Sequence, residues 1–317
     1  MVYMKRYIYG GMAALLLMTT VGCFNTKNEG QSNVDSTAAP KGGSKEDILV
    51  GTLNVVVDAS IFPLMREQEE VFLAAYPNAK LNIIVKPEVL AVKELLADKA
   101  TVAVLARELN EKENEYFANR SIKPRVFPVW SDAVVFVGNT KSADTSVTIP
   151  VVLDMMKGQN ANNKKLIFDN LNSSSFRQLQ ELGKIEKVAS NFVEGVGDAR
   201  GVLNTVMNNS DRIGVISYNE YLDLESSFSN NIRILSVKNT IGEKADNMYY
   251  KPNQSTIAAE QYPLRRTFYV LNYQPNMGLG IGFSAFLTGD RGQRIVLKSG
   301  LVPASMPGRE IIIRDNI

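Results

Sequence analysis

Three consecutive serines, Ser173, Ser174 and Ser175, are the residues of this chain whose type and spacing most clearly suggest chemistry. They follow a short apolar run at residues 166–168 and precede a pattern that is typical of a helix. A serine at such a point caps the helix by accepting a free backbone N–H group. Three serines leave hydroxyl groups over beside the positive end of the helix dipole, which favours an anion. The segment is interpreted either as a capped polar loop or as part of an anion site.

The sequence contains no histidine. Zinc sites of the usual kind, a Ser-His-Asp relay and a histidine pH switch are therefore excluded. A serine hydrolase with a lysine base, such as Lys164 or Lys165, stays open as an alternative, although no Gly-x-Ser-x-Gly elbow is present. We expect no catalytic residue, no cofactor and no metal, so the chain is predicted not to be an enzyme.

Residues 1–22 have the pattern of a secretory signal peptide, with Lys5 and Arg6 before an apolar run at 11–18 and small residues before Cys23. The apolar run is short for a membrane span. Cys23 is the only cysteine, and the segment resembles the lipobox of bacterial lipoproteins, although Thr20 replaces the usual leucine. The alternative is an ordinary signal peptide, in which the thiol of Cys23 carries no lipid. A lipid on Cys23 would anchor the protein to a membrane of the bacterial cell envelope, facing the periplasm or the exterior.

Residues 23–47 are rich in Asn, Ser, Gly, Lys and Thr and contain few large apolar residues, so they are predicted to form a flexible tether. The whole chain has 35 basic and 33 acidic residues. Cleavage after residue 22 removes two basic residues and leaves a formally neutral protein. A neutral protein lacks the broad basic surface that nucleic acid requires, so no nucleic-acid partner is expected.

The body alternates strands with helical patterns, which predicts an α/β fold of two lobes, each a mainly parallel sheet flanked by helices. Residues 212–221 are interpreted as a core strand and a turn. The other expected strands lie at residues 52–57, 81–85, 101–106, 125–129, 133–137, 165–168, 232–237 and 267–271.

Ligands of open α/β sheets bind beyond the carboxyl ends of the strands. Ser60, Arg107 and the serine triplet all follow expected strands. They are therefore the leading candidates for a binding site.

Several segments together carry a family resemblance. The most specific are YPLRRTFYVLN at residues 262–272 and GLGIGFSAFLTGDRGQRIVLKSGLVP at 278–303. The others are VDASIFPLM at 57–65, AVLAREL at 103–109, VFPVWSDAVVFVGN at 126–139, NLNSSSFRQL at 170–179 and RIGVISYNEY at 212–221. On these segments, from about residue 51 to the C-terminus, the chain resembles the phosphate-binding, type II periplasmic binding proteins of ABC transporters.

This resemblance implies two lobes joined by crossing hinge strands, the first formed by residues 48–134 and 266–317 and the second by residues 135–265. It also implies that a monomer captures an inorganic oxyanion between the lobes and delivers it to an ABC transporter permease. Within the resemblance, Arg266 takes the position of an arginine whose role is closer to hinge structure than to ligand contact.

Ser60 occupies the family's first serine site, although a helix cap is an equal interpretation. Ser173, Ser174 and Ser175 stand where the family has Ser-Gly-Thr, and the preceding loop lacks the family's arginine. The guanidinium group of Arg107 could donate two hydrogen bonds to oxygens of a phosphate or sulfate ion. The alternative is that Arg107 forms an ion pair with a carboxylate at the protein surface.

Hydrogen phosphate carries a proton and sulfate does not, so a phosphate-selective site needs a buried carboxylate acceptor. Asp58, Asp132 and Asp169 are the candidates, because each lies near the end of an expected strand, and Asp132 is included in the ligand site. We predict that the site binds phosphate in preference to sulfate. The competing hypothesis is an envelope lipoprotein that uses the same fold for sensing or adhesion.

Overall fold

The computed structural model describes residues 47–159 and 164–306, which all belong to one compact unit. The expected signal peptide (1–22), Cys23 and nearly all of the expected tether (23–47) lie outside the described residues.

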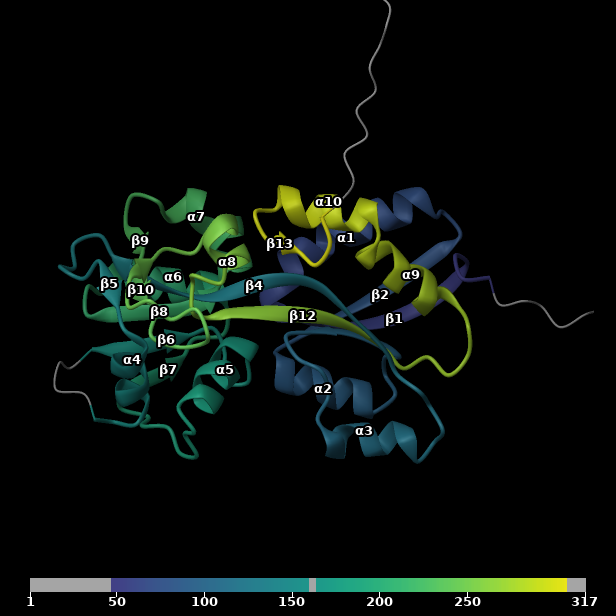
Figure 1. The fold of residues 1–317 in the computed structure, drawn as a ribbon, viewed down its shortest axis with the longest axis horizontal. Helices are drawn as coiled ribbons and strands as arrows, with labels where there is room; N and C mark the ends of the chain where they lie inside the picture. Colours follow the sequence, from purple (N-terminus) through teal and green to yellow (C-terminus); the bar gives the residue numbers. More distant parts are fainter. Residues whose placement is uncertain (1–46, 160–163, 307–317) are drawn as a thin grey trace, which may run out of the picture. The chain divides into compact units, whose positions relative to one another are not determined.

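One mixed sheet forms the centre of the structure, with the strand order β2-β1-β3-β12-β4-β8-β6-β7. Strand β1 pairs in parallel with β2 and β3 at one end, and β6 pairs in parallel with β7 and β8 at the other. The central strands β12 and β4 run antiparallel to each other and to their outer neighbours β3 and β8. Figure 1 shows β4 and β12 side by side between two groups of helices. The expected α/β fold of two lobes is confirmed.

The elements of the first group, called the first half of the molecule below, come mainly from the start and the end of the chain. They are β1 (Gly51–Asp58), the 3-10 helix η1 (Ala59–Ile61), α1 (Phe62–Ala75), β2 (Ala79–Lys86), α2 (Glu88–Leu96), β3 (Val102–Leu105), α3 (Glu111–Ala118), β4 (Arg125–Asn139), β12 (Arg265–Asn272), α9 (Leu279–Thr288), α10 (Asp290–Lys298) and β13 (Val302–Pro303).

The elements of the second group, called the second half below, lie between β4 and β12 in the chain. They are β5 (Ser146–Val147), α4 (Ile149–Met156), β6 (Lys165–Phe168), α5 (Ser174–Leu182), β7 (Val193–Gly195), α6 (Ala199–Asn208), β8 (Arg212–Ser217), α7 (Tyr218–Phe228), β9 (Ile232–Ile234), β10 (Ser236–Lys238), β11 (Tyr249–Tyr250) and α8 (Gln254–Ala258).

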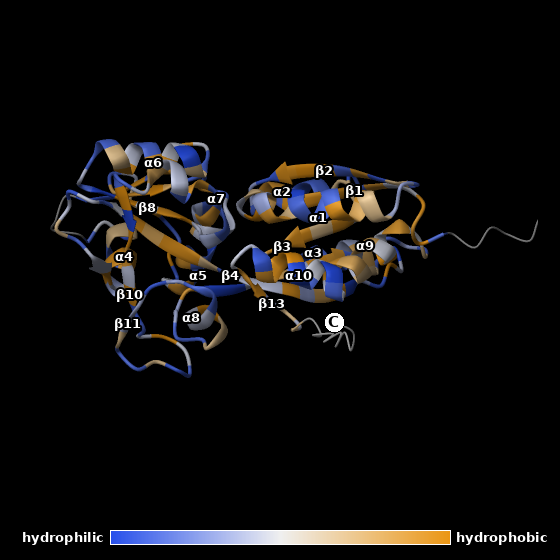
Figure 2. Cartoon of the chain, turned by 90° about the horizontal axis from the view of Figure 1, so that it is seen from above, coloured by the Kyte–Doolittle hydropathy of each residue, from blue (hydrophilic) through white to orange (hydrophobic). Residues whose placement is uncertain are grey.

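Helices cover both faces of the sheet, and strand β1 shows why. Its side chains alternate between the faces, because successive residues of a strand point in opposite directions. Val55 and Val57 pack in one hydrophobic cluster with Phe72 of α1, whereas Val56 packs in the other with Leu95 of α2. The sequence of a strand that is buried on both faces is therefore a nearly continuous run of apolar residues. Figure 2 shows such hydrophobic strands beside helices that carry hydrophilic residues.

Strand β4 corrects the expectation of two separate strands at 125–129 and 133–137. It runs unbroken through Trp130, Ser131 and Asp132, because its first part pairs with β12 and its second part with β8 and β9. Continuous pairing leaves no room for a turn at this point. The expected lobe boundary at residues 134 and 135 falls inside this strand.

Helix α7 is a second correction, because residues 218–221 were expected to be a turn. A capping box starts the helix: Ser217 Oγ accepts the backbone N–H of Glu220, whose carboxylate accepts the N–H of Ser217. The S-x-x-E spacing that signals a capping box is visible in the sequence. Within residues 47–159 and 164–306, no helix has both the length and the apolar character needed to span a membrane.

Candidate functional site

Ser60 lies at the point where β1 gives way to η1 and α1. Its backbone N–H donates to Asp58 Oδ1 (3.1 Å). Ile61, and not Ser60, is the N-cap residue of α1, so the Ser60 hydroxyl does not cap that helix. The hydroxyl is 3.3 Å from Ser174 Oγ on the other half of the molecule. The interpretation of Ser60 as a helix cap is therefore wrong.

The three serines at the start of α5 divide their roles. Ser173 is the N-cap residue, and its Oγ accepts the backbone N–H of Phe176 (3.3 Å). Ser174 and Ser175 are both buried and direct their hydroxyl groups to the guanidinium of Arg266. The cap interpretation holds for Ser173, and the other two hydroxyl groups belong to a polar cluster between the two halves.

Arg266 is the centre of this cluster. Its Nη1 donates to Ser174 Oγ (2.7 Å) and Ser175 Oγ (3.2 Å), and its Nη2 donates to Ser60 Oγ (3.2 Å). Nε and Nη2 also donate to Asp132 Oδ2, at 3.2 and 2.9 Å. These bonds occupy the five N–H donors that a guanidinium has. One arginine therefore gathers the hydroxyl groups of Ser60, Ser174 and Ser175 from both halves.

The burial of Arg266 has a signal in the sequence that the assignment to the hinge overlooked. Side chains in a strand alternate between faces, so Arg266 lies on the same face of β12 as Phe268 and Val270. An arginine in register with two buried apolar residues is expected to be buried and to need a partner. That partner is Asp132, which stands directly opposite in the antiparallel β4.

Helix α7 ties Asp132 and Ser60 to the second half of the molecule. The backbone N–H of Asn219 donates to Asp132 Oδ1 (3.1 Å). Ser217 Oγ donates to the backbone carbonyl of Ser60 (2.7 Å), and Asn219 Oδ1 accepts the N–H of Leu64 (3.3 Å). The site is thus held by the ends of β1 and α5, by the crossing strands, and by the start of α7.

Buried carboxylates surround Arg266. Desolvation, together with the charge of Glu88, raises the pKa of Asp58 to about 6. Desolvation also raises the pKa of Asp169, with Arg266 acting in the opposite direction. The pKa of Glu220 is raised well above its ordinary value by desolvation and by the charges of Asp169 and Asp58. Low solvation and mutual repulsion thus both favour the protonated forms.

Asp132 behaves in the same way, although it is paired with the arginine. Burial raises its pKa, and Arg266 opposes that rise. Among the described residues, no group of three or more histidine, cysteine, aspartate or glutamate side chains could hold a metal ion.

Arg107 has other partners. Its Nη1 and Nη2 donate to the two carboxylate oxygens of Glu113 at 2.7 and 2.8 Å, and its Nε lies 3.6 Å from Glu88. The guanidinium group of Arg107, which was expected to bind a ligand, is therefore bonded to the carboxylate of Glu113, as in the alternative interpretation. Arg177 also pairs with Glu88, and with Glu181.

A pocket of about 340 Å³ opens beside this network. Arg266 reaches its wall from β12, whereas Arg107 reaches it from the segment after β3 and Arg177 from α5. Its lining residues are Ala106, Arg107, Glu108, Arg177, Gln178, Arg266, Thr267 and Tyr269.

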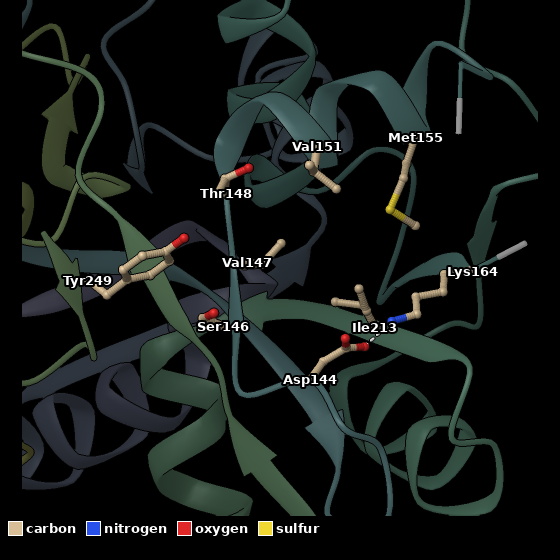
Figure 3. Close-up of a pocket in the computed structure, with 9 residues that line it drawn as sticks. All are labelled: Asp144, Ser146, Val147, Thr148, Val151, Met155, Lys164, Ile213 and Tyr249. Atoms are coloured by element: carbon tan, nitrogen blue, oxygen red, sulfur yellow. Dashed lines mark hydrogen bonds and ion pairs between the residues drawn. The ribbon is translucent and has the colours of Figure 1, made fainter. Parts of the chain in front are cut away.

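A second pocket, of about 190 Å³, contains none of the expected site residues. Figure 3 shows Lys164 directed at Asp144 on one side of it, with Thr148, Val151 and Met155 of the α4 region on another. Lys164, considered as a hydrolase base, therefore forms an ion pair with a carboxylate in a pocket that no residue of the serine triplet lines.

Comparison with known proteins identifies the family. The model of the PBP superfamily domain matches residues 39–291, which is well over half of the chain. The chain belongs to the PBP superfamily. The expected resemblance is confirmed at the level of the superfamily, and membership of the superfamily agrees with the expectation of a binding protein rather than an enzyme. No curated protein shows a significant sequence match to the chain.

Solved structures share the fold of this superfamily member at low identity. A protein from Clostridium perfringens, described as a phosphate ABC transporter substrate-binding protein with bound phosphate, matches with a TM-score of 0.64 and 17% identity. An ABC-type phosphate transport receptor from Vibrio cholerae matches with a TM-score of 0.62 and 19% identity. Both matches cover 80% of this chain and 100% of the other chain.

The same fold also occurs outside transporters. The CcmR regulatory domain of Synechocystis PCC6803, solved in complex with 2-PG, matches with a TM-score of 0.52 and 14% identity. The match covers 74% of this chain and 95% of that domain. Membership of the superfamily supports a solute-binding role, and the fold alone does not identify the solute.

Proposed function

We propose that this protein is a solute-binding lipoprotein that captures an inorganic oxyanion, phosphate in preference to sulfate, and delivers it to an ABC transporter permease. One observation carries the proposal: hydroxyl groups from both halves of the molecule converge on a single buried guanidinium. Ser60 comes from the first half, Ser174 and Ser175 come from the second, and Arg266 lies between them on a crossing strand.

The chemistry of these groups suits an oxyanion. A hydroxyl group rotates, so each serine that accepts a hydrogen bond from Arg266 here can donate one to an anion instead. The guanidinium can turn the same N–H groups to the anion, and its hydrogen bonds to a charged acceptor are stronger than those to the neutral hydroxyl groups that they replace. Ligand that bridges Ser60 and Ser174 favours the closed arrangement of the two halves. The relatives described as phosphate-binding support the choice of phosphate.

The test is a titration of the purified body of the protein, beginning near residue 47, with phosphate, sulfate, molybdate and short peptides. Thermal shift serves as the screen and calorimetry gives the affinities. We expect phosphate to bind more tightly than the other ligands. Tighter binding of sulfate would contradict the choice of phosphate, and failure to bind any oxyanion would contradict the proposal itself.

Ser174→Ala is expected to weaken phosphate binding about 10-fold to 100-fold, because it removes a buried hydroxyl group that contacts both Ser60 and Arg266. Arg107→Ala is expected to change the affinity far less, because Glu113 already occupies its fork. Calorimetry on both variants checks this difference. Equal losses in the two variants would place Arg107 in the site, with its fork released from Glu113 when the anion binds.

The lipid anchor is part of the proposal. Cys23 lies outside the described residues, so support comes from the sequence pattern before it. In a bacterial host, Cys23→Ser is expected to move the protein from the membrane fraction to the soluble envelope fraction. Unchanged membrane association of this variant would contradict lipidation at Cys23.

One observation favours the competing function, an envelope lipoprotein that senses or adheres. All five donors of Arg266 are used within the chain, and several carboxylates surround it. An arginine whose five donors are all bonded within the protein does not require a ligand. The absence of oxyanion binding in the titration, with a folded protein, would favour this alternative.

A further inference from the structure

A mainly apolar groove of about 190 Å³ lies between α9 and the start of β4. Ile281 and Ala285 of α9 line it, together with Phe127 of β4, whose side chain is 45% exposed. The hydroxyl groups of Ser284 and Thr288 donate to carbonyl oxygens of their own helix, so they add no free polar group to the groove. A groove lined by exposed apolar side chains is the kind of surface that another segment covers. It shares no lining residue with the polar cluster between the two halves.

Arg125, at the start of β4, adds a positive charge to this groove. Its Nη1 donates to the backbone carbonyl of Gln274 (3.0 Å), and within residues 47–159 and 164–306 it forms no ion pair. A segment that suits the groove therefore carries apolar side chains next to a carboxylate.

The described part of the chain ends beside the groove. Strand β13 pairs antiparallel with β4, and Figure 2 shows the two strands next to each other. The backbone N–H of Ala304 donates to the carbonyl of Val129 (3.2 Å), so the chain continues in the direction of Phe127. The residues that follow Met306, the last described residue, therefore begin close to the groove.

The segment after Met306 has the composition that the groove calls for. Residues 309–315 read REIIIRD, which places three isoleucines between Glu310 and Asp315. Isoleucine favours an extended conformation on a half-buried surface, and the two acidic residues supply carboxylates at both ends of the apolar run.

The length of this segment also allows it to reach the groove. Pro307 and Gly308 favour a turn, which lets the chain leave the direction of β13 and cross to the groove. Residues 307–313 span up to about 23 Å when they are extended. Phe127 and Arg125 are only about 7 Å apart along their strand.

The other segments outside the described residues lack this combination of features. Residues 160–163 read NANN and carry neither a large apolar side chain nor a charge. The expected tether at 23–47 contains only two large apolar residues, Phe24 and Val34. The apolar run at 11–18 belongs to the expected signal peptide, which is removed from the mature protein.

From these observations we infer that residues 309–315 dock in the groove as an extended segment of the same chain, with Ile311 and Ile313 covering Phe127. Side chains of an extended segment alternate between its two faces, so these two isoleucines share a face and Ile312 points away from the groove.

The charge and the attachment of the segment agree with this docking. One of the carboxylates at its ends, Glu310 or Asp315, pairs with Arg125. Strand β13 holds the start of the segment next to the groove, and the resulting high effective concentration favours the chain's own segment over that of a second copy. The docked segment connects the start of β4 with α9.

The first experiment joins the segment to the groove by a disulfide. Cys23 is the only cysteine, so Ala285→Cys and Ile313→Cys introduce the only two thiols in a Cys23→Ser background. With oxidised glutathione, this pair is expected to form a disulfide within one chain at least about tenfold faster than the control pair Val151→Cys and Ile313→Cys. Val151 is as exposed as Phe127, at 46%, but it lies in the separate pocket of Figure 3. Equal rates for the two pairs, or disulfides formed only between two chains, would overturn the inference.

The second experiment removes the apolar side chains from the segment. Ile311→Ser combined with Ile313→Ser is expected to lower the Tm by about 5 °C, because the groove is then no longer covered by apolar side chains. Ile312→Ser is the matched control and is expected to change the Tm by less than about 1 °C. In a protein that carries Phe127→Ser, the paired substitution is expected to have a smaller effect, because its contact in the groove is already lost. An unchanged Tm in the paired variant, or an equal loss in Ile312→Ser, would overturn the inference.

Discussion

Arg266→Met is expected to lower the free energy of unfolding by about 3–5 kcal/mol and to abolish oxyanion binding. The methionine leaves the Asp132 carboxylate fully buried with no cation opposite it in β12. It also removes the group to which three serine hydroxyl groups are bonded. Chemical denaturation measures the loss of stability, and calorimetry with phosphate measures the loss of binding.

The neighbouring arginine is the matched control. Arg265 lies on the same strand, but its side chain is 32% exposed and pairs with Glu260. Arg265→Met is therefore expected to cost less than about 1 kcal/mol.

Adding Asp132→Asn to Arg266→Met should recover part of the lost stability, because the buried charge is then removed along with its partner. A loss below about 1 kcal/mol for Arg266→Met alone would show that the pair is not the centre of the buried network.

The contribution of Asp58 to stability is expected to fall as the pH rises through the acidic range. Its pKa rises on folding from 3.8 to about 6, so the folded protein holds this proton more tightly than the unfolded chain does. The stabilisation is complete below 3.8 and is lost as the pH rises through about 6. The change corresponds to on the order of 3 kcal/mol. Asp132, Asp169 and Glu220 add in the same direction, because their pKa values are also raised.

Asp58→Asn isolates the contribution of this residue. The stability of the variant relative to the original protein is expected to improve as the pH rises, by on the order of 3 kcal/mol over the whole range. Denaturation at several pH values measures this difference. A difference that does not change with pH would contradict the protonation of Asp58 in the folded state.

Asp98→Asn is a control of opposite sign. Hydrogen bonds from Arg120 and Tyr116 lower the pKa of Asp98, so its contribution is present above its ordinary pKa and is lost as the pH falls. Asparagine tolerates the backbone conformation there, where φ is 56°. The relative stability of this variant should therefore change with pH in the opposite direction.

Much of the fold could be predicted from local patterns. The run at 52–57 became β1 and the run at 165–168 became β6, because a strand buried on both faces needs a continuous apolar stretch. Prediction failed at β4, where Trp130, Ser131 and Asp132 resemble a turn in the sequence. Pairing with β12 on one side and β8 on the other overrode that local preference.

The candidate site could be predicted only in part. Ser60, Ser174 and Ser175 were expected from their places after strands, and the structure brings them together. Asp132 was expected as well, although its partner Arg266 was assigned to the hinge. Arg107 has the right residue type, but Glu113 is only six residues away and forms a capping box that orients its carboxylate.

The sequence by itself determined the alternating strands and helices, the serines that follow two strands, and the exclusion of histidine chemistry. These properties depend on residue type and on neighbours along the chain. Tertiary structure alone decided which charges meet. Arg266 and Asp132 are far apart in the chain, and they face each other because two crossing strands pair in one register. A shift by one residue would turn Arg266 to the other face, and the serines from the two halves would lose their common partner.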